Sequence, residues 1–118
     1  MRLNEIDFRN ALPVTGYGPG FFRVGDTVWQ GPVLLTWGSV AGWGGYADPA
    51  PLLALAGQAD VLFIGTGPDI AHLPPDLRAA LDEADLPYEV MASAAAARSY
   101  NVLLSEGRRI AAALLPAA

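Results

Sequence analysis

The sequence contains no cysteine and no lysine, and it has a single histidine among its 118 residues. Without cysteine, thiolate catalysis and cysteine-ligated zinc are excluded. Without lysine, Schiff-base chemistry and the lysine of a phosphate-binding loop are excluded as well. One histidine leaves only scattered carboxylates as further metal ligands, so we expect no metal site and no cofactor.

Positive charge is also scarce, because seven arginines face twelve acidic residues and the net charge is −5. A basic footprint for DNA, RNA or an anionic membrane surface is therefore missing. No stretch reaches the roughly 20 apolar residues of a membrane-spanning helix, and Met1–Asp7 lacks the apolar core of a signal peptide. We expect a cytoplasmic protein that forms one domain over residues 1–118.

The most distinctive stretch is an apolar run, Val61–Ile64, that leads directly into Gly65-Thr66-Gly67. Such a run closed by glycines predicts a strand buried on both faces. The spacing of Leu77, Ala80, Leu81 and Ala84 then predicts a helix from Pro75 or Asp76 to Asp85. A second short strand is expected at Tyr88–Met91. Together these elements form a βαβ unit, whose two strands should be parallel.

The N-terminal half predicts antiparallel structure. Phe21–Val24 and Thr27–Gln30 flank Gly25-Asp26, which is the pattern of a β-hairpin, and Val33–Thr36 predicts a third strand. Three glycines and a proline predict a loop at Thr15–Gly20. The segment from Trp37 to Asp48, with four glycines, also predicts a loop.

Helix signals follow at two places. Asp48 is a candidate N-cap for a helix over Pro49–Ala56, which Gly57 would end. Ser93 is a candidate N-cap for a helix over Ala94–Glu106, with inner positions expected at Ala95, Val102 and Leu103. After Gly107, the segment Arg108–Leu115 is rich in alanine and suits a helix by propensity. We favour a final strand, because Gly107 and Pro116 isolate it and the sheet needs another neighbour.

A candidate anion site consists of Gly65, Thr66, Gly67 and Ser93, with Arg98 nearby along the chain. Ligands of parallel βαβ units bind beyond the carboxyl ends of the strands. Backbone N–H groups at Gly67 and after Ser93 would hold an anion at a helix start, and the Arg98 guanidinium would complete the pocket. The alternative is that the glycines only make the turn and that Ser93 only caps the helix.

Aromatic residues suggest a second candidate site. Trp37, Trp43 and Tyr46 lie in a glycine-rich segment that would suit an interaction surface. Alternatively, the two tryptophans close the end of a small core, because large aromatic side chains dominate burial.

Other polar residues have competing interpretations. His72 would need a partner such as Asp69 to act as a base, or else it is a solvated loop residue. Asn101 is either part of the Arg98 constellation or a core amide bonded to backbone. Glu106 and Arg109 would suit a structural ion pair. We assign no catalytic residue.

Several segments, taken in order, resemble one family: residues 16–20, Ile64–Gly67, Glu89–Met91, Ala97–Leu103 and Glu106–Leu114. This is the domain-of-unknown-function 498 family, whose relatives include a human mitochondrial assembly factor of respiratory complex I. The resemblance implies an α/β fold: a three-layer β/α architecture with a central mixed sheet and the last strand antiparallel. The N-terminal β-hairpin predicted above adds to it.

The same resemblance implies no established enzymatic activity. Together with the absence of a recognisable catalytic set, it favours an uncharacterised, non-catalytic interaction protein that binds a protein partner, with complex I assembly as the role of the mitochondrial relative. The alternatives are a small-molecule binder or an enzyme that uses the pocket at the Gly-Thr-Gly turn. The sequence identifies neither the partner nor the oligomeric state.

Overall fold

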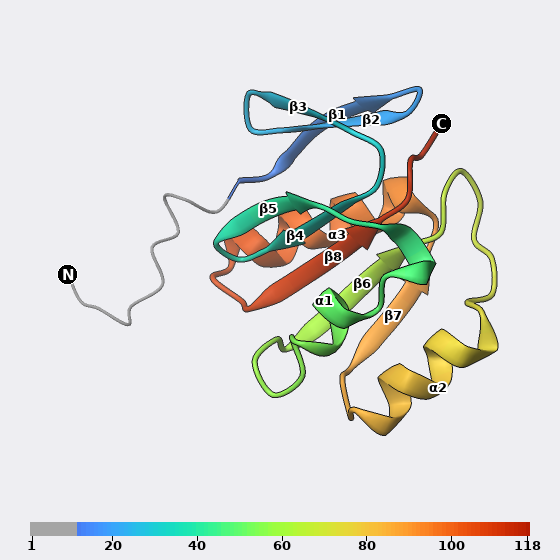
Figure 1. Ribbon diagram of the computed structural model, residues 1–118. Helices are drawn as coiled ribbons and strands as arrows, with labels where there is room; N and C mark the ends of the chain where they lie inside the picture. The colour runs from blue at the N-terminus through green and yellow to red at the C-terminus, as the bar shows by residue number, and fades with distance from the viewer. Residues whose placement is uncertain (1–11) are drawn as a thin grey trace.

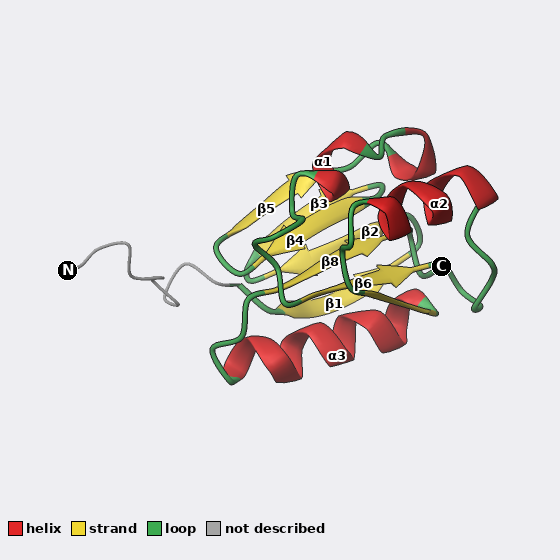
Figure 2. Ribbon diagram, turned by 90° about the horizontal axis from the view of Figure 1, so that it is seen from below, coloured by secondary structure: helices red, strands yellow, loops and turns green. Residues whose placement is uncertain are grey.

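The computed structural model describes residues 12–118, so Met1–Asp7 lies outside the described residues. A five-stranded sheet with the order β5-β4-β8-β6-β7 forms the middle layer. Helices α1 and α2 cover one face, while α3 and a three-stranded sheet, β1-β2-β3, lie on the other (Figures 1 and 2). The expected three-layer α/β fold is thus confirmed. The strands are β1 (Val14–Gly18), β2 (Phe21–Val24), β3 (Thr27–Gln30), β4 (Val33–Thr36), β5 (Ser39–Gly42), β6 (Val61–Gly65), β7 (Tyr88–Met91) and β8 (Ile110–Leu114), and the helices are α1 (Ala50–Leu53), α2 (Pro75–Glu83) and α3 (Ser93–Ser105).

Strand β6 occupies the position that its apolar sequence predicts. It pairs in parallel with β7 on one side and with β8 on the other. Leu62 and Ile64 are buried in the core beneath α1 and α2, whereas Phe63 points into the core beneath α3. Both faces of the strand are therefore covered, which explains why the run carries no polar residue.

The last strand corrects one prediction. Strand β8 is antiparallel to β4 but parallel to β6, so it is not antiparallel to the rest of the sheet. The reason is that α3 returns the chain to the end of the sheet where β7 began. Helix α2 lies on one face and α3 on the other because the two crossovers move in opposite directions along the sheet, as right-handed connections require.

All five residues of β8 are buried, although their sequence is Ile-Ala-Ala-Ala-Leu. The strand is the middle one of its sheet, which overrides the helix propensity of alanine. Its small side chains leave room for the layers on both faces. Ala111 and Ala113 face α1 and α2, and Ala112 faces α3. The prediction of a final strand is confirmed.

The predicted hairpin is confirmed residue for residue, with Val24 opposite Thr27 and with Gly25 at φ +59° in the turn. The predicted loop at Thr15–Gly20 is wrong over most of its length, because Val14–Gly18 forms β1. Its pairing with β2 shifts register between Val14 and Gly16. Backbone pairing at such an irregularity tolerates glycines that weaken a strand by propensity.

The segment from Trp37 to Asp48 is likewise not all loop, because Ser39–Gly42 pairs with β4 as β5. This edge strand is fixed by its tight turn rather than by an apolar pattern. The Asp48 cap is also wrong: Pro49 occupies the N-cap position, and the Asp48 carboxylate accepts the Gly44 N–H at 3.2 Å. Helix α1 ends early at Leu53, and turns continue to Gly57, which has φ +79°.

Helix α3 buries Ala96, Ala97, Tyr100 and Leu104 against β6 and β8. Val102, expected on the inner face, is 57% exposed, and Ala95 and Leu103 are half-buried. The buried residues of the helix lie at the spacing i, i+3, i+4, i+7 and i+11 from Ser93, and Ala95 and Val102 fall outside this stripe. The predicted α2 face is confirmed at Leu77 and Leu81.

Candidate functional site

The Gly-Thr-Gly turn, residues 65–67, begins at the end of β6 and packs closely against the start of α3. A Cβ on Gly65 would lie 2.6 Å from Ser93 Oγ and 2.7 Å from Ser93 Cα. Gly67 has φ +109°, a conformation that L side chains rarely adopt. Both glycines are therefore required by the turn and by the helix packed on it.

Ser93 is fully buried and is the first residue of α3 rather than its N-cap. Its Oγ donates to the Leu115 carbonyl at 2.6 Å and accepts the Gly67 N–H at 2.9 Å. Its own N–H donates to the Gly67 carbonyl at 2.9 Å. The Gly67 N–H, one of the donors expected to hold an anion, thus already has a partner within the protein, whereas these bonds do not involve the N–H groups after Ser93.

Thr66 organises the loop that follows. Its hydroxyl donates to the Asp69 carbonyl at 2.7 Å and accepts the Ala71 N–H at 3.1 Å. The loop is held to the end of β6 by these bonds, and His72 is placed just beyond them. Asp69 and His72 are both exposed.

Arg98 does not join the turn. It lies with Phe63, Glu89, Ser99, Val102 and Leu103 around a shallow depression of about 400 Å³, which we call the Val102 groove. None of the residues of the Gly-Thr-Gly turn lines this groove. The structure therefore brings Gly65, Thr66, Gly67 and Ser93 together, whereas Arg98 lines the Val102 groove.

The aromatic candidates contribute mainly to the core. Trp43 is 5% exposed, its Nε1 donates to the Asp48 carbonyl at 3.0 Å, and its ring meets Tyr46 edge-on with centroids 6.2 Å apart. Trp37 is half-buried against both cores. This packing agrees with the alternative that the tryptophans close the core. Tyr46 alone borders a surface hollow, between α1 and α2.

Asn101 is the core amide that the sequence suggested. Its Oδ1 accepts the Val14 N–H at 2.9 Å, and its Nδ2 donates to the Val14 carbonyl at 2.8 Å. One side chain thus fastens β1 to α3. The ion pair found near the end of α3 joins Arg108 to Asp60 at 3.7 Å on the surface.

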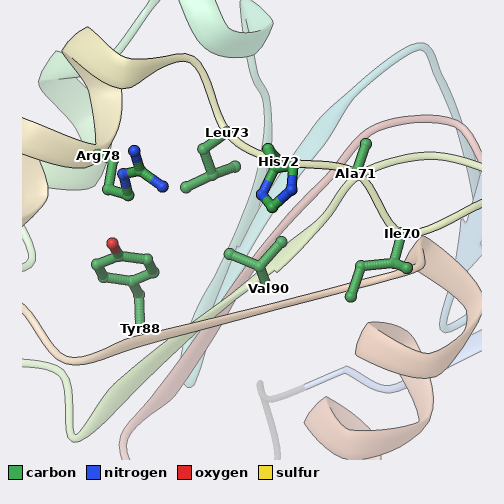
Figure 3. Close-up of a pocket in the computed structure, with 7 residues that line it drawn as sticks. All are labelled: Ile70, Ala71, His72, Leu73, Arg78, Tyr88 and Val90. Atoms are coloured by element: carbon green, nitrogen blue, oxygen red, sulfur yellow. The ribbon is translucent and has the colours of Figure 1, made fainter.

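A cavity of about 310 Å³ lies beside β7, and we call it the Tyr88 cavity. In Figure 3, Arg78 and Tyr88 lie at one end, and Ile70 and Ala71 lie at the other. His72, Leu73 and Val90 lie between them. Sequence reasoning considered only His72 at this site. The others come from a loop, from α2 and from an edge strand, and only the fold brings them together.

Tyr88 marks the charged end of this cavity. Partial burial raises the pKa of Tyr88, and the charge and hydrogen bond of Asp82 raise it further, while the positive charge of Arg78 lowers it. A hydroxyl that donates to a carboxylate stays protonated. Asp82 and Arg78 are one helical turn apart on α2, so both reach the tyrosine.

Strand β7 ends the five-stranded sheet, and within residues 12–118 β6 is its hydrogen-bonded neighbour. The carbonyls of Pro87 and Met91 accept bonds from β6, from the N–H groups of Leu62 and Thr66. Because backbone groups alternate along a strand, Tyr88 and Val90 direct their N–H and C=O groups away from β6. This edge lies between the Tyr88 cavity on the α2 side and the Val102 groove on the α3 side.

Exposed apolar residues flank the same edge. Ile70, at the cavity, is 66% exposed, and Val102, at the groove, is 57% exposed. Among residues 12–118, no three acidic or histidine side chains gather into a set able to hold a metal ion. No helix in the described part of the chain is long and apolar enough to cross a membrane.

The fold and this edge define a class: α/β proteins with a mixed central sheet, a helix-covered face and a small antiparallel sheet on the other face. The family model described as protein of unknown function (DUF498/DUF598) matches residues 14–115. The chain belongs to this family, as its sequence motifs predicted.

Similar proteins share the fold along nearly the whole chain. An uncharacterised protein of Rhodobacter capsulatus is 52% identical over 116 residues, which are 98% of this chain and 94% of that protein. A crystal structure titled an outer membrane protein from Bartonella henselae is 34% identical, with a TM-score of 0.81, and covers 93% of this chain and 98% of that one. A Bordetella pertussis protein described as an Mth938-like domain is 29% identical, with a TM-score of 0.72 and coverage of 98% and 92%.

Proposed function

We propose that this protein is a non-catalytic interaction protein that binds an extended segment of a protein partner along β7. The observation that carries the proposal is the edge at Tyr88 and Val90, which has no hydrogen-bonded strand on its outer side among residues 12–118 and lies between the Tyr88 cavity and the Val102 groove. In strand addition, backbone hydrogen bonds supply affinity and pockets for alternate side chains supply specificity. Edge strands that serve no such purpose are usually shielded.

Side-chain alternation defines what the partner presents. Tyr88 and Val90 border the Tyr88 cavity, so a partner strand would place apolar side chains on that side. Glu89 is exposed and borders the Val102 groove, so a basic side chain would lie opposite it. The partner segment therefore alternates apolar and polar residues and carries a basic residue near its centre.

A second copy of this chain is a poorer occupant of the same edge. An antiparallel pair that joins Tyr88 of one copy to Val90 of the other is centred on Glu89. The two Glu89 carboxylates would then be directly opposite each other, which is destabilising. Glu89 thus protects the edge against self-association and leaves it open to a basic partner.

The family resemblance supports an assembly role, in which this chain accompanies a subunit of a respiratory complex before that subunit reaches its place. The surface apolar residues Ile70 and Val102 fit a transient contact of this kind. A cytoplasmic location belongs to the same proposal. One solved relative is titled an outer membrane protein, so fractionation of cells that express the tagged chain is the direct test of location.

Native capture of the tagged protein tests the binding function. We expect a stoichiometric protein partner with the wild-type chain. Val90→Pro removes one outward N–H from the edge without removing a bond of the sheet, so it should fold and lose the partner. Val40→Pro is the matched control, because Val40 lies on the opposite edge strand, at a position whose N–H also points outward given the β4–β5 register.

The outcomes separate clearly. Loss of the partner with Val90→Pro and its retention with Val40→Pro support strand addition at β7. Capture of the bare protein, or equal capture by wild type and Val90→Pro, contradicts the proposal. If the protein is predominantly a dimer at micromolar concentration, a second copy rather than a partner pairs with the edge. That result would contradict the argument from Glu89.

A further inference from the structure

The Tyr88 cavity has the make-up of a small-molecule site, separate from the backbone edge beside it. Its volume of about 310 Å³ lies at the lower end of the range for such sites, about 300–1,000 Å³. Ile70, Leu73 and Val90 supply an apolar surface, and Leu73 is buried, so that the floor of the cavity is fixed. Nitrogen-bearing side chains, Arg78 and His72, border the same space.

Arg78 is the charged group available to a ligand. Its side chain is exposed, and no carboxylate of residues 12–118 lies within ion-pairing distance of its guanidinium. Burial raises the pKa of the Tyr88 hydroxyl, and Asp82, one turn further along α2, lies close enough to Tyr88 for its charge to raise that pKa further. A guanidinium presents a planar fork of donors that matches a carboxylate.

We propose that the Tyr88 cavity binds a small carboxylic acid, with its carboxylate on Arg78 and its apolar body over Leu73, Val90 and Ile70. His72 borders the middle of the cavity, between its two ends (Figure 3). A ligand with one negative charge fits better than a phosphate, because Asp82 opposes additional charge and the lining is mainly apolar. The binding of an acid here does not require strand addition, although apolar side chains of a partner strand would enter the same cavity.

Methyl-resolved NMR of the full chain at neutral pH tests this site with octanoate as the probe. We expect octanoate to shift the methyl signals of Val90, Leu73 and Ile70 in a saturable way. Octan-1-ol, the neutral analogue, should bind at least about tenfold more weakly. Arg78→Gln should weaken octanoate binding by about ten- to a hundredfold, the range for a hydrogen bond between charged groups.

Two further variants make the test specific. Arg98→Gln removes an arginine from the Val102 groove and should leave octanoate affinity unchanged. Asp82→Asn removes the opposing charge and should tighten octanoate binding. If the methyl signals stay in place, if the alcohol binds as well as the acid, or if Arg78→Gln binds octanoate as tightly as wild type, the proposal is wrong.

The result is distinguishable from that of the interaction experiment. Octanoate binding reports on side chains of the cavity, whereas partner capture by Val40→Pro and Val90→Pro reports on the backbone of β7. Octanoate that binds a protein without a partner would support the cavity and contradict only the strand-addition proposal. Capture of a partner by a chain that does not bind octanoate would support strand addition and contradict only the cavity proposal.

Discussion

Gly65 lies directly beneath Ser93, at a distance that leaves no room for a side chain. A Cβ on Gly65 would come 2.6 Å from the Ser93 hydroxyl oxygen and 2.9 Å from a methyl of Leu114. The contact joins the end of β6 to the start of α3 and to the end of β8. It gives a packing reason for glycine at position 65 and a hydrogen-bonding reason for serine at position 93.

Gly65→Ala should therefore destabilise the protein through overpacking, by about 1–3 kcal/mol. The added methyl meets the backbone of Ser93, which cannot move without displacing α3. Gly42→Ala, in the same sheet, is the control because no heavy atom lies within 4 Å of its Cβ position. Urea unfolding of both variants measures the difference in stability. If Gly65→Ala is as stable as Gly42→Ala, the prediction of overpacking at Gly65 is wrong.

Ser93→Ala should reduce stability by about 1–3 kcal/mol, because it leaves the buried Gly67 N–H and Leu115 carbonyl without their partner. The C-terminal segment should then show faster amide exchange. Ser99→Ala is the comparison, since the Ser99 hydroxyl contacts only the Met91 sulfur at 3.7 Å among the described residues. A Ser93→Ala protein as stable as wild type would mean that water replaces the hydroxyl.

Asn101→Ala should loosen β1, because both backbone groups of Val14 lose their bonds to the Asn101 side chain. The cost is about 1–3 kcal/mol for groups left without partners. Hydrogen exchange should rise in β1 and stay low in β6. Val102→Ala, at the next position, should change stability by less than about 0.5 kcal/mol because the residue is mostly exposed.

Tyr100 should make the protein sensitive to alkali. Burial raises the pKa of Tyr100 above its ordinary value of 10.0, and its hydroxyl donates to the Thr36 carbonyl at 2.8 Å. The unfolded chain loses this proton first, so stability should fall as the pH rises above about 10, at up to about 1.4 kcal/mol per pH unit.

Tyr100→Phe should lower stability near pH 7 by roughly 0.5–1.5 kcal/mol, the net value of one hydrogen bond. It should also flatten the decline in alkali. Part of the decline should remain, because the pKa values of Tyr46 and Tyr88 are raised as well. Chemical denaturation between neutral pH and pH 11 measures both effects. If the stability of wild type and of Tyr100→Phe falls in parallel with pH, Tyr100 is not the source of the alkaline sensitivity.

Much of the fold follows from local sequence. Val61–Ile64 predicts a buried central strand because no polar side chain interrupts it, and Gly25-Asp26 fixes a hairpin because glycine suits the turn. The sequence predicts a loop at β1 because its two glycines and the following Pro19-Gly20 outweigh Val14, Thr15 and Tyr17, and β5 offers only Val40 as a strong strand former. The backbone hydrogen bonds of these two strands to β2 and β4 decide their structure, and the residues of each segment taken alone do not show this pairing.

The site was harder to predict, for a related reason. Gly65, Thr66, Gly67 and Ser93 do come together, as the βαβ pattern requires, but Leu115 of the C-terminal segment also bonds there, to the Gly65 carbonyl and to the Ser93 hydroxyl. Local sequence does not reveal that Leu115 returns to this point. The Tyr88 cavity depends on the fact that β7 lies at the edge of the sheet, which follows from strand order rather than from the residues of β7.

Amide hydrogen exchange at Val90, in the free protein and in its captured complex, tests the central claim most directly. The account predicts that the Val90 N–H exchanges readily in the free chain and becomes strongly protected when a partner strand pairs with it. The Val40 N–H on the opposite edge should exchange at the same rate in both states. Unchanged exchange at Val90, with protection elsewhere on the surface, would contradict binding by strand addition at β7.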